Sequence, residues 1–329
     1  MTTLSTINPT LADVIARTAP DGNIAQLVEM LSEQNGILDY MTFMEGNLLT
    51  GHKHSIRTGL PTVTWRKLYG GVQPSKSRSA SVTDSCGMLE AYAEVDAALA
   101  QLNGNSAAWR LSEEAAFIQA MNKEVASSLI YANEKTSAEE ITGLAPRYNS
   151  LSAENGDNII NAAGAQADNT SIWLVEFGPN SVFGIYPKGS QGGLQMTDKG
   201  QVTVENADGS NGRMEALRTH YRWDLGLTVR DWRCNARICN IDVGDLGTIA
   251  NTKNLLTWMV QASERVESSG GRKVWLVNRT IREKLRLGIL EKIANNLSWD
   301  SVEGKRVMTF DDIPVVRTDA ILNTEAVVS

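Results

Sequence analysis

The chain has 329 residues, of which 42% are hydrophobic, and a formal net charge of -7. This is enough apolar material for a sizeable core divided over about two domains, whereas the acidic balance disfavours a dedicated nucleic-acid-binding protein. No stretch approaches the roughly 20 apolar residues of a membrane span, and the first residues lack a secretory signal pattern, so we expect no membrane partner and a protein that stays in the cytoplasm where it is made.

The N-terminal segment, Met1 to Asn35, gives a broken pattern. Its short apolar groups are interrupted by Pro9, Pro20 and Gly22, which disfavour regular structure. We therefore expect a tail that contains one short amphipathic helix.

The most informative feature is a stretch without acidic residues. Between Asn47 and Thr83 the chain has no Asp or Glu, but it holds six cations: Lys53, Arg57, Arg66, Lys67, Lys76 and Arg78. With these six subtracted, the rest of the chain stands at -13 (-7 - 6), counting His as neutral. Because opposite charges on like subunits attract in a defined orientation, the stretch predicts a contact with an acidic surface, such as another copy of the chain. The alternative is a solvated basic loop.

The same stretch predicts a long hairpin loop with a mobile tip. From His52 to Tyr69 the residues favour a strand, and a turn-rich segment follows from Gly70 to Ser85. Met88 to Val95 then returns to an extended or helical pattern. Trp65 and Tyr69 stand among the cations and could stack on single-stranded nucleic acid, but the acidic chain disfavours that interpretation.

A long helix is predicted from Ser112 to about Asn133. Ser112 suits an N-cap, and the two glutamates that follow it are favoured by the helix dipole. Apolar residues recur every four positions along this helix: Phe117, Met121, Val125 and Leu129. Such a stripe is typical of a helix that packs against a core.

Three strands are predicted after the helix. They cover Ser171 to Phe177, Ser181 to Tyr186 and, as one long run, His220 to Val243. Between the second and third, Gly189 to Gly212 holds six glycines and is expected to be an exposed loop.

The last third of the chain alternates between helices and strands, which predicts a compact mixed α/β unit. The expected elements are a helix over Asn251 to Val266, a short buried strand over Lys273 to Asn278, a helix capped by Thr280, and strands over Arg306 to Phe310 and Ile313 to Val316.

Residues for catalysis or metal binding are scarce. The chain has three histidines, and His52 and His54 would make at most half of a zinc site, with no second pair of ligands nearby. The Gly-rich stretch Ser268 to Lys273 superficially resembles a phosphate loop, but it lacks the required glycine spacing and the Ser or Thr that binds magnesium. A tight turn is the better interpretation. We therefore predict no catalytic residue, no metal and no cofactor.

Two segments near the C-terminus resemble a known family. Lys273 to Arg282 resembles a strand and the start of a helix, and Thr309 to Ile321 contains an F-x-x-I-P-V turn. Together with the basic hairpin and the single long helix, they resemble the major capsid proteins of tailed bacteriophages, which have the Hong Kong 97-type fold. The resemblance covers nearly the entire chain.

The resemblance implies an α+β fold of four parts. These are an N-terminal arm at 1–45, an extended loop at 46–90 that lies over a neighbouring subunit, a mainly peripheral domain at 91–244 with a spine helix at 112–133 and long strands at 171–243, and a mainly axial domain at 245–329. In the family's more usual order the long peripheral strands follow the I-P-V turn. Here they precede it, so a rearranged chain order is expected.

The resemblance also implies self-assembly as hexamers and pentamers into an icosahedral head that encloses double-stranded DNA, in the cytoplasm of a bacterial host. The short segment before the loop leaves no room for a built-in scaffold, so the expected partners are a separate scaffolding protein and a portal, with a cement protein left open. Packaged DNA would be contacted without sequence specificity. The residues expected to contact neighbouring subunits are Lys53, Arg57, Trp65, Arg66, Lys67, Tyr69, Lys76 and Arg78.

Two other functions fit parts of the sequence. A cellular nanocompartment shell of the encapsulin type would have the same fold but enclose cargo protein instead of DNA, and the sequence does not separate it from a phage head. A soluble α/β enzyme is a more distant alternative, which the scarcity of histidines disfavours.

Overall fold

The computed structural model of the protein describes residues 35–101, 106–205, 212–247, 249–290, 297–302 and 305–329. The helix expected within the first 35 residues lies outside this part of the chain. The described residues form two compact units. Unit 1 is built from 88–125 and 193–224, and unit 2 from 35–87, 126–192 and 225–329. No helix among the described residues is long and apolar enough to cross a membrane.

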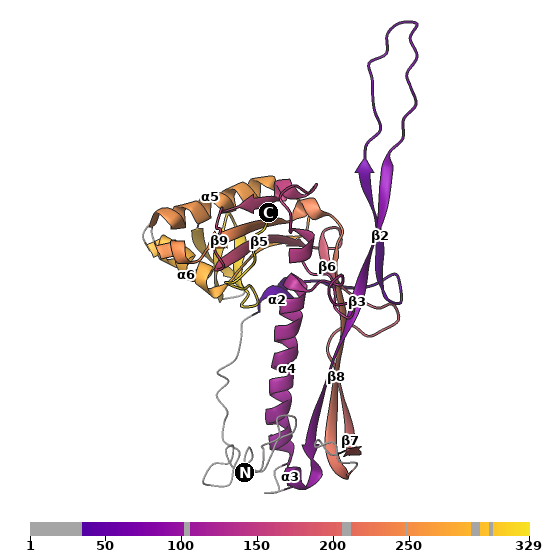
Figure 1. The fold of residues 1–329 in the computed structure, drawn as a ribbon, viewed down its shortest axis with the longest axis vertical. Coiled ribbons are helices and arrows are strands. Elements are labelled where there is room, and N and C mark those ends of the chain that lie inside the picture. The colour runs from indigo at the N-terminus through magenta and orange to yellow at the C-terminus, as the bar shows by residue number, and fades with distance from the viewer. Residues whose placement is uncertain (1–34, 102–105, 206–211, 248, 291–296, 303–304) are drawn as a thin grey trace. The chain divides into compact units, whose positions relative to one another are not determined.

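The acid-free stretch forms a hairpin, as predicted. Strand β2 (Gly51–Gly59) pairs antiparallel with the start of β3 (Arg78–Asp96), from Gly51 opposite Ser85 to Gly59 opposite Arg78. Beyond the paired strands the chain continues from residue 60 to 77 as an irregular loop, at the top of Figure 1. The prediction that the strand runs on to Tyr69 is wrong. β-branched residues favour an extended backbone, but a strand also needs a partner for its hydrogen bonds.

The long helix is confirmed, with different ends. Helix α4 (Ser106–Tyr131) begins six residues before the predicted start, so Ser112 lies inside the helix and is not its cap. Ala, Leu and Arg in the added turn are strong helix formers, which explains the earlier start. The apolar stripe is also confirmed, because Met121, Val125 and Leu129 are buried.

Unit 1 has a small core between strands and a helix. Ala93 of β3, Met121 of α4 and Tyr221 of β8 (Arg213–Val229) are its buried centre, and a short helix, α3 (Ala97–Gln101), follows β3. Strand β7 (Gln195–Glu205) pairs antiparallel with β8. The prediction of an exposed loop over Gly189 to Gly212 is therefore wrong for 195–205. The register shifts between Asp198 and Gly200, and Gly200 adopts a φ of 68°, so this glycine forms a bulge instead of ending the strand.

Unit 2 contains a mixed sheet with the partial order β11-β12-β13-β10-β5-β6. Strands β10 and β13 pair parallel, whereas β10 and β5 pair antiparallel. On the other side, β9 pairs with β5 and β4, and β1 pairs with β6. The strand bounds are β1 (Phe43–Glu45), β4 (Ile159–Asn161), β5 (Asn169–Phe177), β6 (Val182–Tyr186), β9 (Ala236–Asp242), β10 (Arg272–Val277), β11 (Leu297–Val302), β12 (Lys305–Phe310) and β13 (Ile313–Arg317).

Most of the predicted strands of unit 2 are confirmed. The run from His220 to Val243 is not one strand, because a short 3-10 helix at Trp232–Cys234 separates β8 from β9. Strand β11 was not predicted. Every residue of β5 is buried, including its polar ones, which is typical of a central strand covered on both faces.

Two helices cover the sheet of unit 2. Figure 1 shows α5 (Ile249–Arg265) and α6 (Arg279–Leu290) beside β5 and β9. Leu255 and Met259 of α5 and Ile281 and Leu285 of α6 pack in one cluster with Trp275 of β10. Each such side chain contributes about 1.5–3 kcal/mol when fully buried. The cap of α6 is Asn278 and not Thr280, since the Asn278 Oδ1 atom accepts a hydrogen bond from the backbone N–H of Ile281 at 2.8 Å. A further short helix, α2 (Ile37–Tyr40), precedes β1.

Candidate assembly surface

The hairpin holds all eight residues that the sequence singled out. Two lie on β2, one begins β3 and five lie in the irregular tip at 60–77, and every one of them is exposed: Lys53, Arg57, Arg78, Trp65, Arg66, Lys67, Tyr69 and Lys76. Among the described residues, none of the six cations forms an ion pair with a carboxylate. The structure therefore places the predicted residues on one segment, where the cations have no carboxylate partner within the described part of the chain.

Local hydrogen bonds shape the tip. The backbone N–H of Gly70 donates to the carbonyl of Lys67 at 3.0 Å, and the Arg66 Nε atom donates to the carbonyl of Gly70 at 3.0 Å. Across the loop, Ser75 Oγ donates to the carbonyl of Thr62 at 2.9 Å. Tyr69 has a φ of 62° at the turn, a left-handed conformation that non-glycine residues seldom adopt. These contacts form a tight turn that presents Arg66, Lys67 and Tyr69 together.

Apolar side chains of the tip are also exposed. The tip exposes Leu60, Val63, Trp65, Leu68, Tyr69 and Val72. Trp65 is 101% and Tyr69 97% exposed, so neither contacts the rest of the subunit appreciably. Apolar side chains gathered in this way mark interaction surfaces, and Trp, Tyr and Arg are enriched among the residues that dominate binding energy.

The base of the hairpin, in contrast, is fixed by buried charges. Asp84 is 4% exposed and accepts a hydrogen bond from Arg147 Nη2 at 2.8 Å; the same nitrogen donates to the carbonyl of Leu227 at 3.1 Å. His54 is buried with its Nδ1 3.7 Å from Asp84 Oδ2. Burial lowers the pKa of His54, and nearby Asp84 opposes that shift. The base of the hairpin is thus held by contacts within the subunit, whereas the tip is exposed.

The sequence features that suggested other chemistry have structural roles. His52 and His54 stack with ring centroids 6.3 Å apart, and no group of three metal-ligand residues occurs within the described ranges. The Gly-rich stretch at 268–271 is a turn before β10, as predicted. Its backbone N–H groups at Ser269 and Gly271 donate to Glu176 Oε1, at 2.9 and 2.6 Å. A carboxylate of the chain itself thus occupies the position that a phosphate would take.

A second cationic site escaped the sequence reasoning. Arg279, Arg282 and Arg286 lie on α6, and Arg317 ends β13. Arg282 and Arg286 are four residues apart, which places them as neighbours on one side of the helix, and Arg279 precedes Arg282 by three; this spacing is the signal that would have found them.

The comparisons with known proteins identify the family. Residues 19–329 match the family described as Major capsid protein GP7. The chain belongs to this family. A chain from the structure of bacteriophage Epsilon15 is 33% identical, with 100% of this chain and 99% of that chain covered and a TM-score of 0.78. A comparison with curated proteins found no match.

More distant structures also match. The bacteriophage JBD30 capsid is 10% identical over 89% of this chain and 93% of that chain, with a TM-score of 0.48. The SrpI encapsulin of Synechococcus elongatus PCC 7942 is 13% identical over 71% of this chain and 96% of that chain, with a TM-score of 0.43.

Membership of this family determines the functional class of the protein. The chain is a major capsid protein of a tailed-phage head, a structural component of the virion with a mixed α+β capsid fold of the Hong Kong 97 type. The resemblance drawn from the sequence is confirmed, and shell assembly makes the protein a homo-oligomer. The enzyme alternative does not agree with this family.

Proposed function

We propose that the protein assembles as hexamers and pentamers into an icosahedral head around double-stranded DNA, and that the hairpin of β2 and β3 lies over a neighbouring subunit. The observation that carries this proposal is the tip at 60–77, where cations without carboxylate partners among the described residues stand beside fully exposed Trp65 and Tyr69. In an isolated subunit this surface gains nothing from packing. On a neighbour, the aromatic rings supply buried area and the cations set the orientation.

The charge balance supports a neighbour as the partner. Without the six cations of the hairpin the chain carries -13 (-7 - 6), so each copy offers the next one an acidic surface. Obligate interfaces commonly bury about 2,000 Å² or more, and an extended hairpin reaches such an area without a large globular contact. Many weak contacts in a closed shell then add up by multivalency.

We assign the remaining parts by the same proposal. The segment at 1–45 acts as an N-terminal arm, 46–90 as the extended loop, 91–244 mainly as the peripheral domain and 245–329 mainly as the axial domain, in a rearranged chain order. A separate scaffolding protein and a portal complete the head, and packaged DNA touches the acidic wall without specific contacts.

A double charge reversal tests the role of the tip. We expect Arg66→Glu with Lys67→Glu to leave a folded subunit but to lower the amount of sedimenting particles by about tenfold or more, because like charges then meet at the interface. The matched control is Lys135→Glu with Lys199→Glu, two exposed lysines outside the hairpin. Electron microscopy and sedimentation of the protein produced with its scaffolding partner give the readout. Normal particles from the tip variant would contradict the proposed role.

A further inference from the structure

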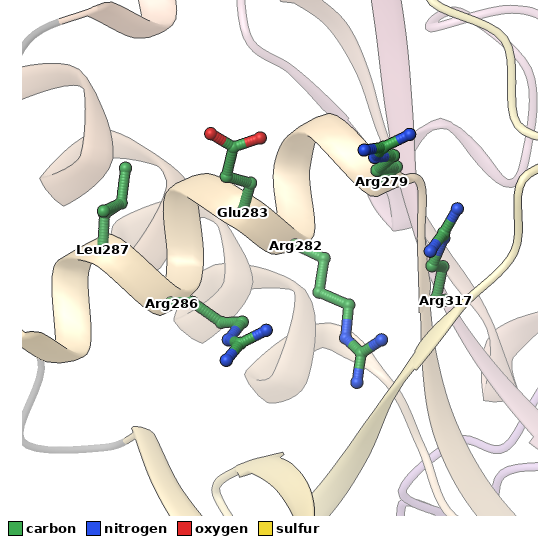
Figure 2. A pocket seen from close by; sticks show the side chains of 6 residues that line it. All are labelled: Arg279, Arg282, Glu283, Arg286, Leu287 and Arg317. Carbon is green, nitrogen blue, oxygen red and sulfur yellow. The ribbon is translucent and has the colours of Figure 1, made fainter.

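A pocket lined by arginines lies beside the first turns of α6. It has a volume of about 380 Å³ and is lined by Arg279, Arg282, Glu283, Arg286, Leu287 and Arg317. Figure 2 shows Arg282 and Arg286 on one side of the helix and Glu283 pointing to the other. The single carboxylate of the lining therefore does not lie between these two guanidinium groups.

The positive charge of this pocket is only partly compensated. Arg317 forms a paired contact with Asp319, with Nε to Oδ1 and Nη2 to Oδ2 distances of 2.6 Å each. The Nε atom of Arg282 is buried and has no hydrogen-bond partner among the described residues. Burial lowers the pKa of Arg282, and the nearby charges of Arg286 and Arg317 lower it further, whereas the nearby Asp319 opposes this shift. An arginine in this state is stabilised by an anion that enters the pocket.

The helix itself adds to the repulsion. Arg279 and Arg282 lie in the first turn of α6, where the helix dipole is positive and cations are unfavourable by about 0.3–1 kcal/mol. Like charges three and four residues apart on one helix also repel each other. Both effects are unfavourable for Arg279 and Arg282 in the isolated subunit, and a bound anion would offset them.

We propose that the arginine pocket binds carboxylate side chains of an adjoining copy of this chain. The inference rests on the proposed shell assembly, which brings copies into contact. Without the four arginines the chain would carry -11 (-7 - 4), so each copy has acidic surface to offer. Arginine recognises carboxylates through paired N–H donors, which suits this occupant.

The shape and lining of the pocket favour a protein segment over DNA. A concave site of about 380 Å³ admits a few side chains, whereas a duplex presents a broad convex backbone. Leu287 is 43% exposed at the site and offers an apolar contact that a phosphate backbone does not use.

Neutralising the first-turn arginines tests the proposal. We expect Arg279→Gln with Arg282→Gln to lower the yield of sedimenting particles by about tenfold or more, while the melting temperature of the unassembled subunit stays the same or rises. The matched control is Lys253→Gln with Lys284→Gln; Lys284 lies on the same helix but does not line the pocket. Equal yields from the two double variants would overturn the proposal. A lower yield with a lower melting temperature would assign the arginines to folding and overturn it as well.

Chemical cross-linking then identifies the partner. The variant Arg279→Lys keeps the charge and introduces an amine that a carbodiimide joins to a contacting carboxylate. Particles assembled from isotope-labelled and unlabelled copies, analysed by mass spectrometry, should give a link from the introduced amine of one copy to a carboxylate of another. Links only within one copy would contradict the proposal. So would normal particles of the Gln variant that fail to retain DNA, a result that favours nucleic acid.

The same experiments separate this inference from the proposed function. If the wild-type protein formed no particles with its scaffolding partner, the proposed shell assembly and the pocket's occupant would both be wrong. If the wild-type and the lysine control form particles and the pocket variant does so equally, only the inference about the arginine pocket fails.

Discussion

Charged side chains are exposed at the hairpin tip and, within the described part of the chain, unpaired, whereas near the C-terminus they are buried and paired. At the tip, Arg66 and Lys67 are exposed and have no carboxylate partner among the described residues. Near the buried C-terminal segment, the side chains of Arg237 on β9 and Glu325 are each 4% exposed and form an ion pair with Nη2 to Oε2 at 2.9 Å. The tip cations thus have no carboxylate partner among the described residues, whereas the buried charges form an ion pair.

The buried pair belongs to a larger network. Arg237 Nη1 donates to the carbonyl of Tyr148 at 2.8 Å, and Arg237 stacks over Trp173 at 4.9 Å. Tyr131 donates its hydroxyl hydrogen to Glu325 Oε1 at 2.5 Å, and Ser171 also donates to this carboxylate. The network connects the last residues of the chain to the rest of unit 2. The charges of the proposed assembly surface are therefore not among those that pair within the described part of the subunit.

A large effect on folding is expected from breaking the buried pair. Glu325→Ala leaves the Arg237 charge buried and unpaired, so we expect the free energy of unfolding to fall by about 3–5 kcal/mol. Urea unfolding of the full-length subunit measures the change. The matched control is Glu267→Ala, because Glu267 pairs with Arg233 at 3.2 Å with side chains 63% and 51% exposed; its effect should stay below about 1 kcal/mol. Equal losses would show that burial does not set the strength of these pairs.

The sequence predicts most elements of this fold but not their pairing. The stripe through Met121, Val125 and Leu129 identifies α4, because a helix buries one face and its period is visible locally. Strand β7 was missed because the glycines in and around it were interpreted as loop residues, whereas its backbone pairs with β8, the next strand along the chain. At the hairpin tip the error was the opposite, because a strand was predicted where the structure has an irregular loop. A strand-like composition does not provide the partner strand that a strand needs for its hydrogen bonds.

The residues of the candidate site could likewise be predicted from the sequence only in part. The acid-free stretch is visible as a run in the chain, so its residues could be named from the sequence. The arginine pocket joins α6 to the end of β13, and Arg317 reaches it only through the parallel pairing of β10 and β13. Asn278 and Glu176 likewise stabilise the fold, because their side chains accept hydrogen bonds from backbone N–H groups. Such roles depend on three-dimensional positions that a single sequence does not show.

The titration of His54, at the base of the hairpin, is expected to have a smaller effect on the free energy of unfolding. The charged or titratable groups that influence its pKa are those of Asp84, His52, Arg147 and Arg230. Its pKa in the folded protein lies below the ordinary value of 6.5, mainly because of burial. The unfolded chain therefore binds the proton more readily. The contribution of His54 is fully present above about pH 6.5 and is lost as the pH falls through the lowered pKa.

This sign gives a direct test. We expect the wild-type subunit to lose more free energy of unfolding between about pH 7.5 and about pH 5 than His54→Gln does, because glutamine does not titrate. Urea unfolding at a series of pH values gives both slopes. Parallel slopes would mean that the buried histidine keeps its ordinary proton affinity. The charge state of the hairpin base would then not affect folding stability, unlike the charges of the buried network.

The smallest effect on folding is expected at the tip. Trp65→Ser with Tyr69→Ser should change the free energy of unfolding by no more than about 0.5 kcal/mol, because both rings are almost fully exposed. The same variant should form few particles, because the rings lose the area that a neighbouring subunit would bury. Trp173→Ser is the matched comparison: Trp173 is fully buried, and its loss should destabilise the subunit by about 3–5 kcal/mol. If the tip variant were as unstable as the Trp173 variant, the rings would be part of the subunit's own core, and the separation of folding from assembly would not hold.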